Sequence, residues 1–133
     1  MVKPANHRPL TSAAHLVLGR QGEAVAERYL LGLGYAIRAR NIRLRRCEID
    51  LIAFDPREQM LVFVEVKTRA ADSLSYPIHS AITGRKRRAL RLAVSRWVIR
   101  EAYDGPGRID VVCVCGERVV EHLKAIGSDF FVE

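Results

Sequence analysis

Two apolar segments of this chain carry charged residues that could do chemistry. Residues 47–54 and 61–67 are otherwise rich in Ile, Val, Leu and Phe, a composition typical of strands. The charged positions within them are Glu48, Asp50, Glu65 and Lys67. A charge inside a strand of this kind needs a partner, a metal or a catalytic task, because burying it alone is costly.

The spacing of the two segments predicts which charges meet. Six residues separate them and include an Asp-Pro pair typical of a turn. A symmetric hairpin pairs positions whose numbers add up to 115, so Asp50 faces Glu65. Glu48 then faces Lys67, and period 2 puts all four on one face. The alternative is a set of cross-strand salt bridges, but an acid facing an acid argues against that design.

Two facing carboxylates suit a divalent cation. Mg²⁺ takes oxygen ligands and keeps several waters, so one or two carboxylates suffice to hold it. A lysine two residues beyond Glu65 can stabilise charge in a transition state or orient a metal-bound water. The pattern therefore indicates a metal site formed by Asp50 and Glu65, with Lys67 beside it.

Length and composition favour one cytoplasmic domain. In a chain of 133 residues, we expect a flexible arm at residues 1–11 and a single domain at 12–133. No stretch approaches the ~20 apolar residues of a membrane span, and the first residues lack the apolar core of a signal peptide. The three cysteines are odd in number and lack CxxC spacing, which argues against disulfides and against a zinc site.

The net charge of +7 is concentrated in two stretches. Arg38–Arg46 holds five arginines and Arg85–Arg100 holds seven basic residues, both without an acid. Arginine-rich stretches favour recognition of phosphate or nucleic acid. The alternative is a solvated helix face and an edge strand protected by charge.

A long helix is expected before the two charged strands. It begins at Thr11 or Ser12, runs to about Leu33 and stops at Gly34. The stripe expected to face inward is Leu16, Gly19, Glu23, Ala26, Leu30 and Leu33. Glu23 is the acid on this stripe: it either pairs with Arg20 or Arg28, or points at the metal site.

The other elements complete an α/β domain around a mixed sheet. The periodicity predicts a strand at Tyr35–Ile42 with a basic face, a helix from His79 or Ser80 to Ala102, and strands at Arg108–Cys115 and Val119–Leu123. The expected inward face of that helix is Ala89, Leu90, Ala93, Val94, Trp97 and Val98. Lys86 extends this face, so it either reaches the charged strands or covers the surface with its alkyl stem.

Several motifs together resemble one known family. They are Gly19-x-x-Gly22-Glu23, Arg40-Asn41, Glu48-Ile49-Asp50-Leu51-Ile52-Ala53, Val62-Phe63-Val64-Glu65-Val66-Lys67-Thr68-Arg69 and Arg108-Ile109-Asp110-Val111-Val112. From about Gly19 to Val114 the chain resembles the YraN (UPF0102) family, which is similar to PD-(D/E)XK nucleases and archaeal Holliday junction resolvases. The resemblance implies a restriction-endonuclease-like αβββαβ core, with a mixed central sheet flanked by helices.

The resemblance also implies roles for individual residues. The implied catalytic residues are Glu23, Asp50, Glu65 and Lys67, and the implied ligands for Mg²⁺ or Mn²⁺ are Asp50, Glu65 and the Val66 carbonyl. Glu48 and Lys86 would support the site. Cys47 departs from the family, which usually has Gly before Glu-Ile-Asp, and its side chain would narrow the approach to the strand.

These observations together predict a metal-dependent endonuclease that hydrolyses phosphodiester bonds in structured or branched DNA. The residues expected to hold the DNA backbone are Arg43, Arg45, Arg46, Arg69 and Arg88. Cutting two strands of a junction would require a homodimer. One alternative is a nucleic-acid-binding module on a nuclease scaffold with weak or no catalysis. Another is a structural partner of a DNA-processing protein that docks through the basic surface.

Overall fold

The computed structural model describes residues 12–69 and 83–126. Its elements are α1 (Ser12–Gly32), β1 (Ala36–Leu44), β2 (Cys47–Asp55), β3 (Met60–Thr68), α2 (Gly84–Glu101), β4 (Gly107–Cys115) and β5 (Arg118–Leu123). The order is the expected αβββαβ followed by one more strand. The arm expected at residues 1–11 lies outside the described residues.

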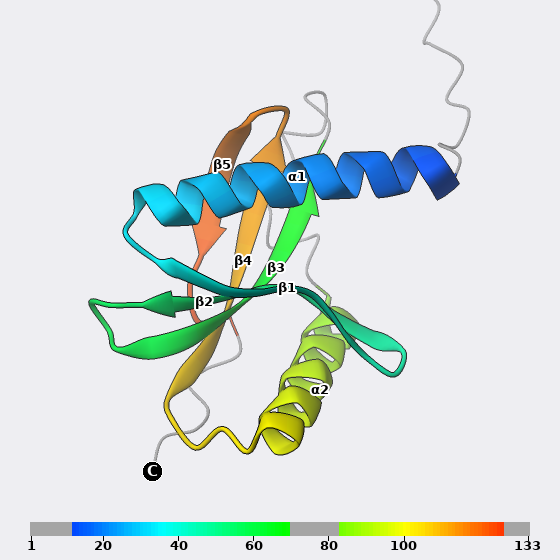
Figure 1. Ribbon diagram of the computed structural model, residues 1–133. Coiled ribbons are helices and arrows are strands. Elements are labelled where there is room, and N and C mark those ends of the chain that lie inside the picture. Colours follow the sequence, from blue (N-terminus) through cyan, green and yellow to red (C-terminus); the bar gives the residue numbers. More distant parts are fainter. Residues whose placement is uncertain (1–11, 70–82, 127–133) are drawn as a thin grey trace, which may run out of the picture.

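The five strands form one mixed sheet between two helices. The strand order is β1-β2-β3-β4-β5, with β3 and β4 parallel and the other neighbours antiparallel. Helices α1 and α2 lie on opposite faces of this sheet (Figure 1). Because β3 and β4 are parallel, the chain must cross over between them, and α2 makes this crossover. The fold class predicted from the sequence is confirmed.

Helix α1 covers one face through residues spaced three and four apart. Val25, Ala26 and Leu30 are buried against strand residues of that face. Leu33, expected on the same stripe, is 43% exposed, so that assignment was wrong. The helix ends at Gly32, and Gly34 has a φ of +93°, which turns the chain away before Leu33 can point inward.

Helix α2 covers the other face and begins later than expected. The Thr83 hydroxyl caps it by accepting from Lys86 N at 3.1 Å, and the helix runs from Gly84. Its buried residues are Leu90, Ala93 and Val94, while Ala89 is exposed, contrary to expectation, since it lies about 100° round the helix from Leu90. None of the helices in the described ranges is long and apolar enough to cross a membrane.

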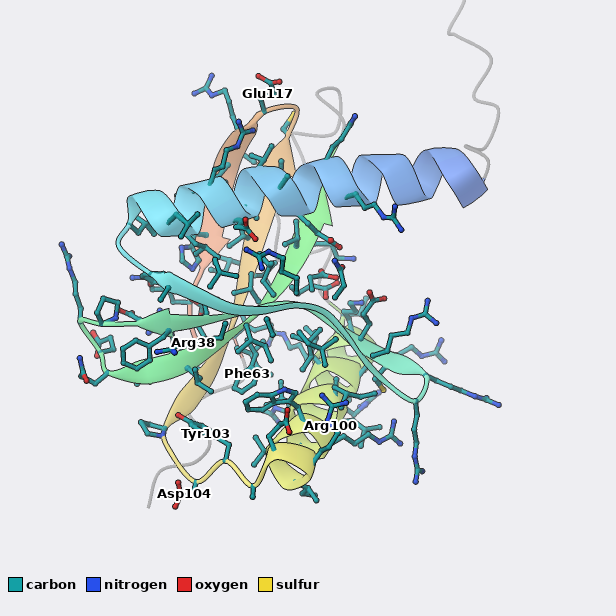
Figure 2. The ribbon with its side chains drawn as sticks, in the orientation of Figure 1. Arg38, Phe63, Arg100, Tyr103, Asp104 and Glu117 are labelled. Carbon is teal, nitrogen blue, oxygen red and sulfur yellow. The ribbon has the colours of Figure 1, made fainter. Side chains whose placement is uncertain are left out.

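Aromatic rings fill the space between α2 and the sheet. Figure 2 shows Phe63 between the strands and this helix. The Trp97 ring stands edge-on to Phe63, with centroids 5.3 Å apart, and lies 5.9 Å from the ring of Tyr103. Edge-to-face pairs of this kind add to the stabilisation that burial provides, so this cluster fixes the seat of α2.

The predicted register of β2 and β3 is confirmed, but their ladder is short. Paired positions add up to 115 from Asp55↔Met60 to Leu51↔Val64, where the ladder ends. Beyond that point β2 stays with β1, and Glu48 pairs with Arg43. The expected pairing of Glu48 with Lys67 was therefore wrong.

The separation of β2 from β3 has a cause in β1. The register of β1 shifts between Ile37 and Ala39, and Asn41 has a φ of 51°, a conformation that asparagine tolerates better than most residues. Such irregularities increase the local twist of a strand pair. The end of the β1–β2 hairpin consequently curls over α2 (Figure 1), where Arg96 Nη1 donates to Leu44 O at 3.4 Å.

A buried ion-pair network ties together the other end of the sheet. Arg108 Nη1 lies 2.9 Å from Asp55 Oδ2, and Arg108 Nε lies 3.0 Å from Asp110 Oδ1. Arg108 Nη2 also donates to the Tyr35 hydroxyl at 2.8 Å. His122 Nε2 lies 2.8 Å from Asp110 Oδ2. The network joins β2, β4 and β5.

We expect Arg108→Met to lower the free energy of unfolding by about 3–5 kcal/mol, because Asp55 and Asp110 would stay buried without their cation. Urea denaturation measures the loss. The control is Arg40→Met, which removes an exposed ion pair with Glu27 and should leave the urea midpoint close to that of the wild type, because exposed ion pairs add little stability. Equal losses in the two variants would contradict the importance of the buried network.

Candidate functional site

Three of the acids singled out from the sequence meet where β2 and β3 separate. Asp50 lies on β2, Glu65 on β3 and Glu23 on α1. Asp50 Oδ2 accepts a hydrogen bond from Val66 N at 2.8 Å. The Asp50 carboxyl also hydrogen-bonds with Glu65 and with Glu23. Asp50 is thus the centre of the acid cluster, and Glu23 points at it from the helix, as one of the two hypotheses predicted.

The acid cluster raises the proton affinity of its central carboxyl. Burial, followed by the negative charge of Glu65, raises the pKa of Asp50 to about 8, although the hydrogen bond from Val66 N opposes this. Burial and the charge of Glu48 raise the pKa of Glu23, against a hydrogen bond from Asn41. The raised pKa of Asp50 therefore favours retention of a proton within the cluster, and a bound cation would compete with that proton.

Two lysines border the acid cluster in different ways. Lys86 Nζ lies 3.0 Å from Glu65 Oε1, so α2 supplies a positive charge to β3. Of the two hypotheses for Lys86, this contact agrees with the one in which its side chain reaches the charged strands. Lys67 is half-buried on the same face of β3 as Glu65, two residues away, and within the described residues it has no ion-pair partner.

Two neighbours of the acid cluster received no role from the sequence. With its amide oriented by this contact, Asn41 Nδ2 donates to Glu23 Oε2 at 2.8 Å. Gly22 faces β3 so closely that a Cβ there would overlap the Thr68 hydroxyl oxygen. Both residues belong to motifs that carried the family resemblance, and this was the sequence signal that could have pointed to them. The contact of Asn41 with Glu23 depends on the bend of β1, where Asn41 has a positive φ. The contact of Gly22 with Thr68 depends on how closely α1 lies above the sheet.

The predicted DNA-binding arginines occupy different surroundings. Arg43, Arg45 and Arg46 are exposed at the end of the β1–β2 hairpin, and Arg88 is exposed on α2. Arg69 is half-buried and hydrogen-bonds to the Cys113 thiol, while its backbone N donates to Val114 O at 2.8 Å. Arg69 is therefore attached to β4, whereas the other four present their guanidinium groups to solvent.

The donors present suit a hard cation that brings its own waters. In the two described ranges, no three His, Cys, Asp or Glu side chains form a group able to hold a metal ion. Two carboxyls, those of Asp50 and Glu65, do share one gap. The N–H and C=O of one strand residue point toward the same neighbouring strand, so the Val66 carbonyl faces this gap together with its N–H. Two carboxylates, one carbonyl and waters are an acceptable set for Mg²⁺ or Mn²⁺.

The fold and the acid cluster together define an α/β protein with an αβββαβ core and a carboxylate–lysine site at the split of its second and third strands. Comparison with known proteins gives the family. The model described as "Uncharacterised protein family UPF0102" matches residues 22–114, and the chain belongs to this family, as the motifs indicated. Residues 22–114 include every member of the acid cluster.

Relatives of similar length support this assignment. The chain is 41% identical to a UPF0102 protein of Chlorobium limicola over 117 residues, covering 87% of this chain and 89% of that protein. It is 42% identical to one from Mycobacterium tuberculosis over 129 residues, covering 89% and 98%. A third, from Geotalea uraniireducens, is 39% identical over 112 residues, covering 80% and 86%.

The close approach at Gly22 makes a testable difference between two helix glycines. Nothing lies within 4 Å of a Cβ placed at Gly19, so Gly19→Ala should gain up to about 1 kcal/mol from helix propensity. Gly22→Ala should instead lose about 1–3 kcal/mol, because the methyl group overlaps Thr68. Chemical denaturation compares the two. Adding Thr68→Ala should restore much of the loss, and a stabilising Gly22→Ala would show that α1 does not depend on this contact.

The raised pKa of Asp50 predicts a pH dependence of folding in metal-free buffer. The ordinary value is 3.8 and the folded value about 8, so the folded chain keeps a proton that the unfolded chain has released between these limits. Stability from this group is complete below about pH 4 and is lost as pH rises to about 8.

Between pH 5 and 8 the wild type should therefore lose at least about 1.4 kcal/mol relative to Asp50→Asn, the equivalent of a tenfold change in proton affinity. The Asn amide can donate to Glu65 without titrating. Urea unfolding of both proteins across this range, in the presence of a chelator, measures the difference. Parallel curves for the two proteins would show that Asp50 does not hold the proton.

Proposed function

We propose that this protein is a metal-dependent endonuclease acting on structured or branched DNA. One observation carries the proposal: the Asp50 and Glu65 carboxyls interact where the β2–β3 ladder ends, and Lys67 follows Glu65 two residues further along the same face of β3. A purely structural acid pair is better served by an arginine between the two carboxylates, which is how Arg108 serves Asp55 and Asp110. Among residues 12–69 and 83–126 no arginine bridges Asp50 and Glu65, and the Lys86 ammonium forms an ion pair with Glu65 alone.

The metal would be held by Asp50, Glu65 and the Val66 carbonyl, and we propose Mg²⁺ or Mn²⁺. When bound, such an ion polarises the phosphodiester and lowers the pKa of an attacking water. The hydrogen bond from Val66 N fixes one oxygen of Asp50, and the contact with Glu23 restrains its carboxyl further. Preset ligands of this kind reduce the reorganisation needed at the moment of reaction.

The lysines have separate tasks in this proposal. Lys67 supplies the positive charge that orients the attacking water or stabilises the developing charge on the phosphate. Lys86 holds Glu65 in place from α2. Glu48 is exposed and acts on the acid cluster through its charge on Glu23, so it tunes the site without joining its centre.

The basic surface supports nucleic acid as the substrate. Arg43, Arg45, Arg46 and Arg88 are exposed and suited to phosphate contacts, which supply most of the non-specific affinity for DNA. The resemblance to junction resolvases favours a branched substrate. Cleavage of two strands would need two active sites, and a homodimer is therefore part of the proposal.

A second candidate is a DNA-binding module without catalysis. The ion pair at 3.0 Å between Lys86 and Glu65 favours it, because a cation at Glu65 would have to compete with this lysine. This candidate predicts salt-sensitive DNA binding and no metal-dependent cleavage of linear, flap or four-way DNA by the wild type.

We expect Asp50→Asn and Lys67→Ala to lower cleavage at least about 100-fold while leaving DNA affinity within about threefold, since neither residue belongs to the arginine surface. Cleavage of linear, flap and four-way DNA in Mg²⁺ and in Mn²⁺ tests this, with anisotropy for binding. Asp104→Asn, an exposed acid on the loop after α2 (Figure 2), is the matched control. Wild-type cleavage by Asp50→Asn would exclude the proposed mechanism.

A further inference from the structure

A concave surface lies apart from the acid cluster, between α2 and the end of the β1–β2 hairpin. It is a pocket of about 420 Å³, which we call the hairpin pocket. Its lining residues are Arg43, Leu44, Arg45, Arg96, Ile99 and Arg100. Figure 2 shows Arg100 on α2, the helix that forms one wall. The volume lies within the range typical of small-ligand sites.

The hairpin pocket carries positive charge with little compensation. In the described part of the chain, only Arg100 of its four arginines lies within 4.0 Å of a carboxylate, that of Glu101, although Glu48 faces Arg43 across the β1–β2 ladder. A concave surface lined by one sign of charge concentrates ligands of the opposite sign. Guanidinium groups match phosphate oxygens with two parallel hydrogen bonds, so the charge favours a phosphate-bearing ligand.

Two of the arginines are already held in position. Arg96 Nη1 donates to Leu44 O at 3.4 Å, and Arg100 Nη1 lies 3.5 Å from Arg43 O. These bonds fasten α2 to the hairpin and use only part of the five N–H donors that each guanidinium has. Arg96 Nη1 also lies 3.4 Å from Cys47 Sγ, and Arg100 Nη2 lies 4.0 Å from Glu101 Oε1. Within the described chain this leaves both Nε groups and Arg96 Nη2 for a ligand.

The hairpin pocket also has an apolar part that a phosphate alone would not need. Leu44 is buried beneath the hairpin, whereas Ile99 is 80% exposed. Among the exposed large hydrophobic residues of the described chain, Ile99 has the highest exposure. An apolar side chain beside guanidinium planes suits the face of a nucleobase, since bases stack on Arg guanidinium planes and the contact with Ile99 removes apolar surface from water. Inside a duplex these faces are covered by neighbouring base pairs, so away from duplex ends only an unpaired nucleotide can offer one.

We propose that the hairpin pocket binds an unpaired nucleotide of the DNA substrate, with its phosphate on the arginines and its base against Ile99. This inference rests on the proposed function for the identity of the ligand as nucleic acid. It adds a substrate class, namely DNA in which a duplex meets a single strand.

The position of the hairpin pocket relative to the acid cluster fits this class. Leu44 pairs with Cys47, the first residue of β2, and Asp50 follows three residues later on the same strand. At about 3.3 Å per residue the two sites are on the order of 10 Å apart along β2. Ile99 itself follows Lys86 by 13 residues, about 20 Å along α2 at 1.5 Å per residue, so a strand held there would reach the acid cluster over about three to six nucleotides at ~3.4 Å each.

The test compares fluorescence anisotropy on three DNA probes: a single strand, a blunt duplex and a duplex with a single-stranded flap. A chelator is present so that nothing is cleaved. Ile99→Ser should weaken binding of the single strand and the flap by about 5- to 10-fold, because the apolar contact between the Ile99 side chain and the base is lost. Duplex affinity and the salt slope should not change, because no charge is removed.

Two further variants sharpen the comparison. Leu92→Ser, on the same helix and 47% exposed but outside the hairpin pocket, is the matched control and should bind like wild type. Arg45→Gln should lower the slope of log affinity against log salt by about 0.7 on the single strand. Equal weakening on duplex and flap by Ile99→Ser, or no weakening on either, would overturn the proposal.

The failure of this inference can be told apart from the failure of the proposed function. If no probe is cleaved with metal but Ile99→Ser still weakens flap binding selectively, the endonuclease proposal fails and the hairpin pocket stands. If the wild type cleaves in a metal-dependent way but Ile99→Ser binds every probe like wild type, the hairpin pocket fails and the endonuclease stands.

Discussion

The early end of the β2–β3 ladder is the constraint on which the site depends. Beyond Leu51↔Val64 the two strands no longer pair, and the backbone of β3 is left facing a gap. The Asp50 carboxyl fills part of that gap by accepting from Val66 N. A side chain thus replaces a ladder contact, and this holds an acid within reach of Glu65. The raised pKa of Asp50 and the orientation of Val66 both follow from this replacement.

The turn length let the sequence predict the register, because a short hairpin leaves few alternatives and the apolar pattern excludes a slip of one residue. The same reasoning failed at Glu48, since it assumed that two straight strands stay paired to their ends. The divergence depends on a register shift in β1 and on the positive φ of Asn41. Neither is visible in the alternation of apolar and polar residues, so Asn41 beside Glu23 could not be foreseen.

Helix faces were predicted well at their centres and poorly at their edges. Ala26, Leu30, Leu90 and Ala93 are buried as expected, whereas Leu33 and Ala89 are not. The errors fall where a cap ends the helix or where a small apolar residue sits at the border of the stripe. Lys86 lies in the first turn of α2, where a long side chain can still reach past the helix end to the sheet, and its contact with Glu65 follows from that reach.

Buried acids at the two ends of the sheet have opposite electrostatic surroundings. Asp55 and Asp110 share one arginine and further donors, and hydrogen bonds with Arg108 and the backbone lower the pKa of Asp55 against the effect of burial. Asp50 has a carboxylate as its nearest charged partner and its pKa moves the other way. Stability is thereby concentrated at one end, and the other end keeps the unfavourable charge arrangement that active sites often retain.

Trp97 makes the contact of α2 with the sheet observable by fluorescence. It is the single tryptophan of the chain, and its ring lies between Phe63 of the sheet and Tyr103 at the end of α2. Intrinsic fluorescence excited at the indole therefore reports on one interface alone, the contact of α2 with the sheet. Lys86 is carried by the same rigid helix, about 16 Å away at 1.5 Å per residue. The emission of this one ring thus reads out whether the helix that brings Lys86 to Glu65 is seated.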